Sequence, residues 1–216
     1  MNKNGVLLAS GGLDSTTLAY WLLNNDIDFI PLFINYGQHC AETEFESLIK
    51  VLPTSKINKI EKIDVSSIYS QSNSRFIQEA DLWNEKVEAD DLYLPYRNIL
   101  LLTIAASFAQ TKGFSYVYSA FINSNHAKEI DCSNQFFESM GQILGDYGTV
   151  NIEMPFLTYS KYEVAKIGIE LGAPIGKTFS CQASSTIPCG ACPNCVDRLN
   201  ALKLIEEEEI SNNFSL

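Results

Sequence analysis

The sequence predicts a doubly wound α/β fold, in which helices cover both faces of a parallel β-sheet. Short apolar runs alternate along the chain with segments of helical periodicity, which is the pattern of βαβ units. An apolar fraction of 46 % in 216 residues is enough for a real core and rules out wholesale disorder. Ligands of such sheets bind beyond the carboxyl ends of the strands, so the residues that follow each strand are the first candidates for a site.

Strands are predicted where a short apolar run is bounded by turn residues. Val6–Ala9 is apolar throughout, and Phe29–Tyr36 is rich in Ile and Phe. Continuous runs of this length are typical of strands that are buried on both faces of a parallel sheet. Ile57–Val65 has mixed strand character, and the last predicted strand is Tyr116–Phe121.

Helices are predicted where apolar side chains recur every three or four residues. In the first helix, for example, Leu18, Trp21 and Leu22 share one side. Gly172 and Pro174 end the last one, because glycine and proline stop helices at these positions. The predicted helices are Leu13–Leu23, Glu42–Leu52, Asn98–Gln110, Asn134–Leu144 and Ser160–Leu171.

Two stretches depart from this alternation. Ser66–Tyr93 is polar, and we expect a long excursion that either lies over the site or is a surface insertion. Thr178–Arg198 has little periodicity and holds four of the six cysteines. We therefore divide the chain into an α/β domain, 1–177, and a cysteine-rich segment with a C-terminal helix, 178–216. The acidic run Glu206–Glu209 is expected to be a solvated helix face.

Charge and hydropathy exclude several classes of protein. Fifteen Lys and Arg against 26 Asp and Glu give a formal charge of −11, which disfavours direct binding to nucleic acid. There is no run of about 18 apolar residues to predict a membrane span. The apolar stretch near the N-terminus is too short for a secretion signal, so we expect a cytoplasmic protein. Cysteines in that compartment are reduced or metal-bound.

The segment Ser10–Thr17 (SGGLDSTT) joins the first strand to the first helix. Its two glycines permit positive φ and close backbone approach. Unpaired N–H groups in the first helical turn, together with the helix dipole, form an anion site to which serine and threonine hydroxyls add donors. Asp14 either caps the loop or helps to hold Mg²⁺. The predicted nucleotide-binding residues are Ser10, Gly11, Gly12, Asp14, Ser15 and Thr16.

Four cysteines follow the spacing C-x7-C-x2-C-x2-C, and they are Cys181, Cys189, Cys192 and Cys195. Gly190 and Pro193 favour tight turns between them, so that several thiolates can reach one metal. Four thiolates suit a closed, structural Zn²⁺ site. An iron–sulfur cluster also accepts four cysteines, but the chain has no other redox signal, and zinc is favoured.

The loop resembles the SGGxDS pyrophosphate loop of the N-type ATP pyrophosphatases. Together, loop and cysteines resemble the 7-cyano-7-deazaguanine synthase family of the queuosine pathway, over nearly the whole chain. Other family-like segments are Asn35–His39 with Glu42, Leu94–Asn98, Asp131–Cys132, Ser160–Glu163 and Arg198. The resemblance implies a Rossmann-like, adenine nucleotide alpha hydrolase-like fold and a homodimer. It also implies ATP-dependent conversion of 7-carboxy-7-deazaguanine and ammonia to the nitrile through adenylated intermediates.

The resemblance also suggests roles for individual residues. Arg97 is a candidate cation for phosphate or for the substrate carboxylate, or else forms a surface salt bridge. Lys161 would balance the pyrophosphate charge, or else is a solvated lysine at a helix start. Asp131 would accept from the guanidine-like edge of a purine. The candidates are Asp14, Arg97 and Lys161 for catalysis, and Gln38, His39, Arg97, Asn98 and Asp131 for substrate binding, with ATP, Mg²⁺ and Zn²⁺ as cofactors.

The chain departs from the family mainly on the acceptor side. Ile130 and Ser133 stand where the family usually has Pro and Arg around the Asp–Cys pair. Tyr96 replaces a common glycine before the Arg–Asn pair, and Gln182 replaces an aromatic residue after the first zinc cysteine. The predicted nucleotide-binding and zinc-binding residues match the family pattern. The departures therefore bear on the identity of the acceptor substrate more than on the adenylation step.

Three other functions compete with nitrile synthesis. The first is a divergent amide ligase that adenylates a deazaguanine-type carboxylate and joins it to another amine, on a small molecule or a protein. A tRNA thiolase is disfavoured by the −11 charge and by the lack of a CxxC pair near the loop. A non-catalytic nucleotide-binding subunit is disfavoured by the intact Asp14 and Arg97.

Overall fold

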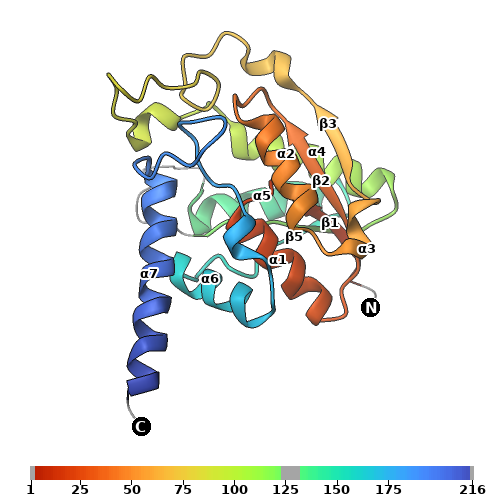
Figure 1. The fold of residues 1–216 in the computed structure, drawn as a ribbon. Coiled ribbons are helices and arrows are strands. Elements are labelled where there is room, and N and C mark those ends of the chain that lie inside the picture. The colour runs from red at the N-terminus through yellow and green to blue at the C-terminus, as the bar shows by residue number, and fades with distance from the viewer. Residues whose placement is uncertain (1–2, 123–131, 215–216) are drawn as a thin grey trace.

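A computed structural model describes residues 3–122 and 132–214 of the chain. Five strands form one sheet in the order β3-β2-β1-β4-β5, and every neighbouring pair is parallel (Figure 1). This confirms the predicted α/β fold. The strand β5 was not predicted, because it has only three residues and none of them is fully buried. The strands are β1 (Gly5–Leu8), β2 (Phe29–Asn35), β3 (Glu61–Asp64), β4 (Tyr116–Tyr118) and β5 (Asn151–Glu153).

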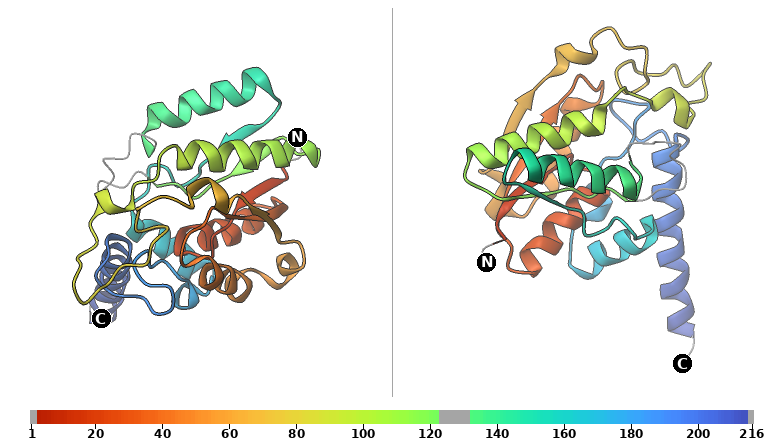
Figure 2. Two further views of the ribbon diagram at one scale, coloured as in Figure 1. Left: turned by 90° about the horizontal axis from the view of Figure 1, so that it is seen from above. Right: turned by 180° about the vertical axis from the view of Figure 1, so that it is seen from behind.

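Helices cover both faces of the sheet, as Figure 2 shows. The helices α4 and α5 lie on one face, and α1, α2, α6 and α7 lie on the other. The long helices are α1 (Leu13–Asn24), α2 (Ala41–Val51), α4 (Arg97–Thr111), α5 (Asn134–Tyr147), α6 (Lys161–Glu170) and α7 (Pro193–Phe214). Short ones are α3 (Thr54–Ile57), η1 (Ser66–Tyr69), η2 (Ala89–Leu92) and η4 (Ile175–Lys177).

Side chains of the three central strands alternate between the two faces, as expected for a period of two. On one face, Val6, Leu32 and Val117 pack against Ala105 and Ala106 of α4. The small alanines let α4 approach the sheet closely.

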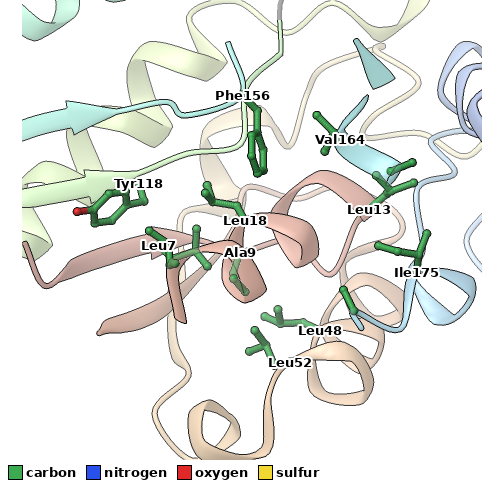
Figure 3. Close-up of a cluster of buried hydrophobic side chains, with 14 of the residues drawn as sticks. Leu7, Ala9, Leu13, Leu18, Leu48, Leu52, Tyr118, Phe156, Val164 and Ile175 are labelled. Atoms are coloured by element: carbon green, nitrogen blue, oxygen red, sulfur yellow. The ribbon is translucent and has the colours of Figure 1, made fainter. Parts of the chain in front are cut away.

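The opposite face holds the larger hydrophobic cluster, shown in Figure 3. Leu7 of β1 and Tyr118 of β4 meet Leu18 of α1, Leu48 of α2 and Val164 of α6 in this cluster. The leucines and the valine are almost completely buried. Each such side chain contributes about 1.5–3 kcal/mol to folding. The cluster therefore fixes where α1 and α6 begin, at the edge of the sheet where the site lies.

The helix α7 begins among the cysteines, earlier than the lack of periodicity suggested, and its C-terminal part extends beyond the body of the protein (Figure 1). Ala201 and Ile205 of α7 belong to the large cluster, so this segment shares a core with residues before 178. Lys166 of α6 pairs with Glu208 at 2.7 Å, and the Tyr162 hydroxyl donates to the same carboxylate. One member of the acidic run is thus used to join α6 and α7.

The excursion that follows β3 packs onto the rest of the protein. Tyr69, Phe76 and Leu92 are buried in a second cluster, which they share with Tyr36 from the turn after β2 and with Cys181. The excursion and the cysteine-rich segment therefore meet beside the ends of the strands.

One stretch, Ala89–Thr111, is long and apolar enough to cross a membrane by length and composition. In the structure it comprises η2, the following turn and α4, and α4 packs its alanine side against the sheet. A core helix of an α/β protein has the same composition.

The close pairing of β1 with β4 gives a test of the sheet. A Cβ added at Gly5 would lie 2.4 Å from the backbone oxygen of Tyr116, which cannot move away. We expect Gly5→Ala to lower the free energy of unfolding by about 1–3 kcal/mol, measured by urea denaturation. The matched control is Gly141→Ala in α5, where a Cβ meets nothing within 4 Å, and helix propensity should raise stability by up to about 1 kcal/mol. A Gly5→Ala protein as stable as the wild type would contradict this register.

Candidate active site

A cavity of about 250 Å³ lies at the carboxyl ends of the central strands. Ser10 follows β1, Tyr36 follows β2 and Ser119 follows β4, and all three line it. The chain runs outward from β1 to β2 and β3 and then returns to place β4 on the other side of β1. The cavity thus occupies the topological switch point of the sheet, where α/β folds bind their ligands.

The loop after β1 is fixed by the backbone of Gly11. This residue has φ +76°, and a Cβ there would lie 2.5 Å from the Leu48 amide nitrogen and 2.6 Å from the Glu44 carbonyl oxygen. Its own carbonyl accepts hydrogen bonds from the Phe179 N–H at 3.1 Å and from the Ser47 hydroxyl at 2.9 Å. Only glycine fits this position, which joins the loop to α2 and to the cysteine-rich segment.

The N-terminus of α1 opens towards the cavity without a side-chain cap. Its N-cap residue, Gly12, has an extended backbone and lines the cavity. The Ser10 and Ser15 hydroxyls lie 3.2 Å apart beside it. An uncapped first turn leaves N–H groups to bind an anion. Buried polar atoms of the same region also have no partner among the described residues, namely Asp14 Oδ1, Thr16 Oγ1, Thr17 Oγ1 and Ser180 Oγ.

A cation and a carboxylate meet beside this turn. Lys161 Nζ lies 2.5 Å from Asp14 Oδ2, and both side chains line the cavity and are mostly shielded from solvent. Lys161 opens α6, where Ser160 and Glu163 form a capping box that holds the helix start in place. Lys161 is therefore a partly buried member of the site, and its ammonium group can face a phosphate.

Arg97 occupies the other side of the cavity, at the start of α4. Its guanidinium stacks 4.3 Å from the centre of the Phe76 ring, and its Nε donates to Asn98 Oδ1 at 3.3 Å. It also bonds to the buried Tyr36 hydroxyl; burial raises the pKa of Tyr36, and Arg97 acts against that rise. The Asn98 side chain is fully buried and donates to Cys132 Sγ at 3.1 Å. The guanidinium of Arg97 is therefore a positioned positive charge in the cavity, and Asn98 mainly positions Arg97 through its hydrogen bond.

The turn after β2 places the two remaining described candidates differently. Gln38 lines the cavity, but its Oε1 accepts from the Tyr36 N–H at 2.9 Å and its Nε2 donates to Glu44 Oε2 at 3.0 Å. His39 bonds through Nδ1 to the Ser185 hydroxyl at 2.7 Å and through Nε2 to a backbone carbonyl of the cysteine-rich segment at 3.1 Å. The structure thus shows Gln38 as a support of this turn and His39 as an anchor of the cysteine-rich segment. Asp131 lies outside the described residues.

Glu44 is a cavity residue that the sequence did not single out. It lies on α2 and lines the cavity together with Arg97. Burial raises the pKa of the Glu44 carboxyl, and hydrogen bonds from Gln38 and from the Cys40 thiol act against that rise. The sequence shows only three acids at alternate positions, 42, 44 and 46, and nothing in the pattern marks the middle one.

The four cysteines of the C-terminal segment come together as predicted. Their Sγ atoms all lie within 4.8 Å of one another. Four sulfurs around Zn²⁺ at about 2.3 Å would lie roughly 4 Å apart, so the set fits a tetrahedral ion. Backbone N–H groups donate to Sγ of Cys181 at 3.4 Å and to Sγ of Cys189 at 3.2 and 3.4 Å, which favours thiolates. Thiol donors at Cys192 and Cys195 lower the pKa of Cys181.

The cluster is tied to the rest of the site by the start of α7. Arg198 donates to the carbonyl of Ile175 at 2.7 Å and to the Thr178 hydroxyl. The next residue, Phe179, is the one whose N–H bonds to Gly11. A metal ion at the cysteines would therefore hold a segment that contacts the loop after β1 directly.

Comparison with known proteins identifies the family of the chain. A family model described as "Queuosine biosynthesis protein QueC" matches residues 4–206. A 7-cyano-7-deazaguanine synthase from Methanospirillum hungatei is 30 % identical over 211 residues, 93 % of this chain and 94 % of that one. The corresponding synthase from Archaeoglobus fulgidus is also 30 % identical, over 96 % of this chain and 92 % of its own.

A solved structure shares the fold at much lower identity. It is a 4-thiouridine synthetase in complex with RNA and bound ATP, which is 15 % identical, covers 95 % of this chain and 53 % of its own, and has a TM-score of 0.51. The match to the family model and the relatives of nearly equal length show that the chain belongs to the QueC family of queuosine biosynthesis proteins.

Proposed function

We propose that the protein is an ATP-dependent ligase that converts 7-carboxy-7-deazaguanine and ammonia into 7-cyano-7-deazaguanine. The observation that carries this proposal is the uncapped N-terminus of α1, which opens into a cavity at the switch point of the sheet. The names of the relatives, which align over nearly their whole length, supply the substrate class.

The phosphates of ATP would bind at the first turn of α1. The turn offers N–H groups and the Ser10 and Ser15 hydroxyls, and Lys161 adds a positive charge. Asp14 Oδ1 is buried and has no partner among the described residues, which suits a cation, so Asp14 would hold the Mg²⁺ that neutralises the phosphates. Thr16 Oγ1 in the same turn is likewise buried without a partner in the described part of the chain, and it would be a further donor for this end of the nucleotide.

Arg97 would bind the carboxylate of the acceptor. A carboxylate is a poor electrophile, and transfer of AMP to one of its oxygens supplies a leaving group. Ammonia then displaces AMP to give an amide, and a second adenylation, on the amide oxygen, lets AMP leave again to give the nitrile. The protein mainly positions the reactants and stabilises negative charge, for which a guanidinium held by Phe76, Asn98 and Tyr36 is well placed.

Zn²⁺ is the ion that we propose for the four cysteines. Their donor set is all sulfur, and four protein ligands leave no open position, so its role is structural. Through Phe179 and Gly11 the ion would keep the nucleotide loop in shape.

An amide ligase is the second candidate, and Tyr96 is the observation that favours it. Tyr96 has φ +58°, a value that explains why a glycine is common before the Arg–Asn pair. Its side chain is 73 % exposed next to Arg97, so this edge of the site carries an aromatic ring that a glycine would lack. The Tyr96 ring changes the side of the cavity where the acceptor would bind, which is consistent with an amine other than ammonia as the second reactant.

A single assay separates these functions. Protein is incubated with ATP, Mg²⁺, 7-carboxy-7-deazaguanine and ammonium, and pyrophosphate and product mass are followed. We expect the nitrile with two pyrophosphates per product. Asp14→Ala should slow pyrophosphate release at least about 100-fold, because a charged group at the phosphates is lost. The exposed Asp146→Ala is the control and should be unaffected. Formation of an amide without nitrile supports the amide ligase. If 7-carboxy-7-deazaguanine causes no release of pyrophosphate, both the nitrile-forming ligase and the amide ligase are contradicted.

Metal analysis tests the zinc proposal. We expect one zinc per chain in the purified protein. Cys192→Ser should lose the ion and weaken ATP binding, because the segment that bonds to Gly11 would no longer be held. Cys132→Ser, whose thiol lies outside the cluster, should keep one zinc per chain. Four freely titrating thiols in the folded wild-type protein, without bound zinc, would contradict the proposal.

A further inference from the structure

Two carboxylates line the cavity in the part of the chain that the structure describes, and they have different partners. Asp14 is paired with Lys161 at the phosphate end. Glu44 accepts hydrogen bonds from neutral groups, the Gln38 amide at 3.0 Å and the Cys40 thiol. Arg97 is near enough to Glu44 to act on it electrostatically, and it lines the same cavity. Glu44 therefore sits at the acceptor end, beside the cation that would hold the acceptor.

Glu44 is also fixed in place. The Gln38 amide that donates to it is held by the backbone of the turn after β2, through Tyr36 N–H and the Ile34 carbonyl. The backbone carbonyl of Glu44 lies against Gly11, so the same residue borders the nucleotide loop. A carboxylate at this point lies between the loop that would bind ATP and the arginine that would bind the acceptor.

The reaction proposed above needs a base at that point. When the ammonia nitrogen attacks the acyl adenylate, the new C–N bond forms, the C–O bond to AMP breaks, and one N–H proton must leave. Adenylation of the amide oxygen releases pyrophosphate and one N–H proton and leaves a neutral imidate. In the nitrile-forming step this imidate loses its remaining N–H proton while its C–O bond to AMP breaks, and the freed electron pair completes the C≡N bond. Both steps release one proton from nitrogen and no electrons.

We propose, building on the ligase function above, that the Glu44 carboxylate is the general base that accepts the proton from nitrogen in both steps. The burial that raises the pKa of Glu44 makes the carboxylate a stronger base than an exposed glutamate. His39 is the histidine within the described residues. It is engaged through both ring nitrogens by the cysteine-rich segment, which leaves Glu44 for this role.

The test separates the nitrogen steps from the adenylation. Adenylation alone is measured as the exchange of labelled pyrophosphate into ATP that requires 7-carboxy-7-deazaguanine, in the absence of ammonium. Glu44→Gln keeps the size and the polar character of the side chain but removes the base. We expect the ratio of ammonium-dependent turnover to exchange to fall about 100-fold or more. Hydroxylamine is reactive enough, through its α-effect, to attack an acyl adenylate without base catalysis, so with it the same variant should recover most of its rate and yield the hydroxamate.

The exposed Glu46→Gln, two residues away on α2, is the matched control and should leave both rates unchanged. A Glu44→Gln protein with an unchanged ratio would overturn the proposal. A variant that loses exchange and turnover together, without rescue by hydroxylamine, would also overturn it, since Glu44 would then act in folding or binding. Failure of exchange in the wild-type protein would instead contradict the ligase function itself.

Discussion

The carbonyl group of Gly11 joins the three parts of the molecule from which the site is built. It accepts from α2 through Ser47 and from the cysteine-rich segment through Phe179, while its Cα lies against the backbone of α2. The positive φ of this glycine turns the chain from β1 into α1 and points the first helical turn at the cavity. This contact adds to the hydrophobic clusters and to the hydrogen bonds of His39 in holding the loop, α2 and the cysteine-rich segment together.

Each end of the cavity holds one carboxylate and one cation. Asp14 and Lys161 lie at the end formed by α1 and α6, whereas Arg97 and Glu44 lie at the end formed by α4 and α2. Such a separation suits a reaction in which a nucleotide and an acceptor meet at one phosphorus atom. The excursion after β3 completes the second end, because its buried Phe76 supplies the ring on which Arg97 stacks. The excursion is thus part of the site.

Local sequence signals predicted the parts of the site that depend on local structure. The SGGLDSTT loop lies between a strand and a helix, as its glycines and hydroxyl residues indicate, and the four cysteines converge as their spacing predicts. The short strand β5 and the helix α7 gave no such signal, because β5 is specified by pairing with β4 and α7 by packing onto α6.

The positions of polar side chains depend even more on tertiary structure. His39 follows a strand, as site residues often do, yet its ring turns to the cysteine-rich segment, more than 140 positions away in the chain. Glu44 looks like any acid on an amphipathic helix until α2 is packed against the turn after β2. Such contacts are long-range, and periodicity along one segment does not contain them.

The proposed function depends on binding of the ATP phosphates at the first turn of α1. The decisive experiment is a crystal structure of the protein with a non-hydrolysable ATP analogue and Mg²⁺. We expect phosphate oxygens within hydrogen-bond distance of the backbone N–H groups of residues 13–15 and of the Ser10 and Ser15 hydroxyls, with Lys161 beside them. A nucleotide bound elsewhere, with this turn empty, would contradict it.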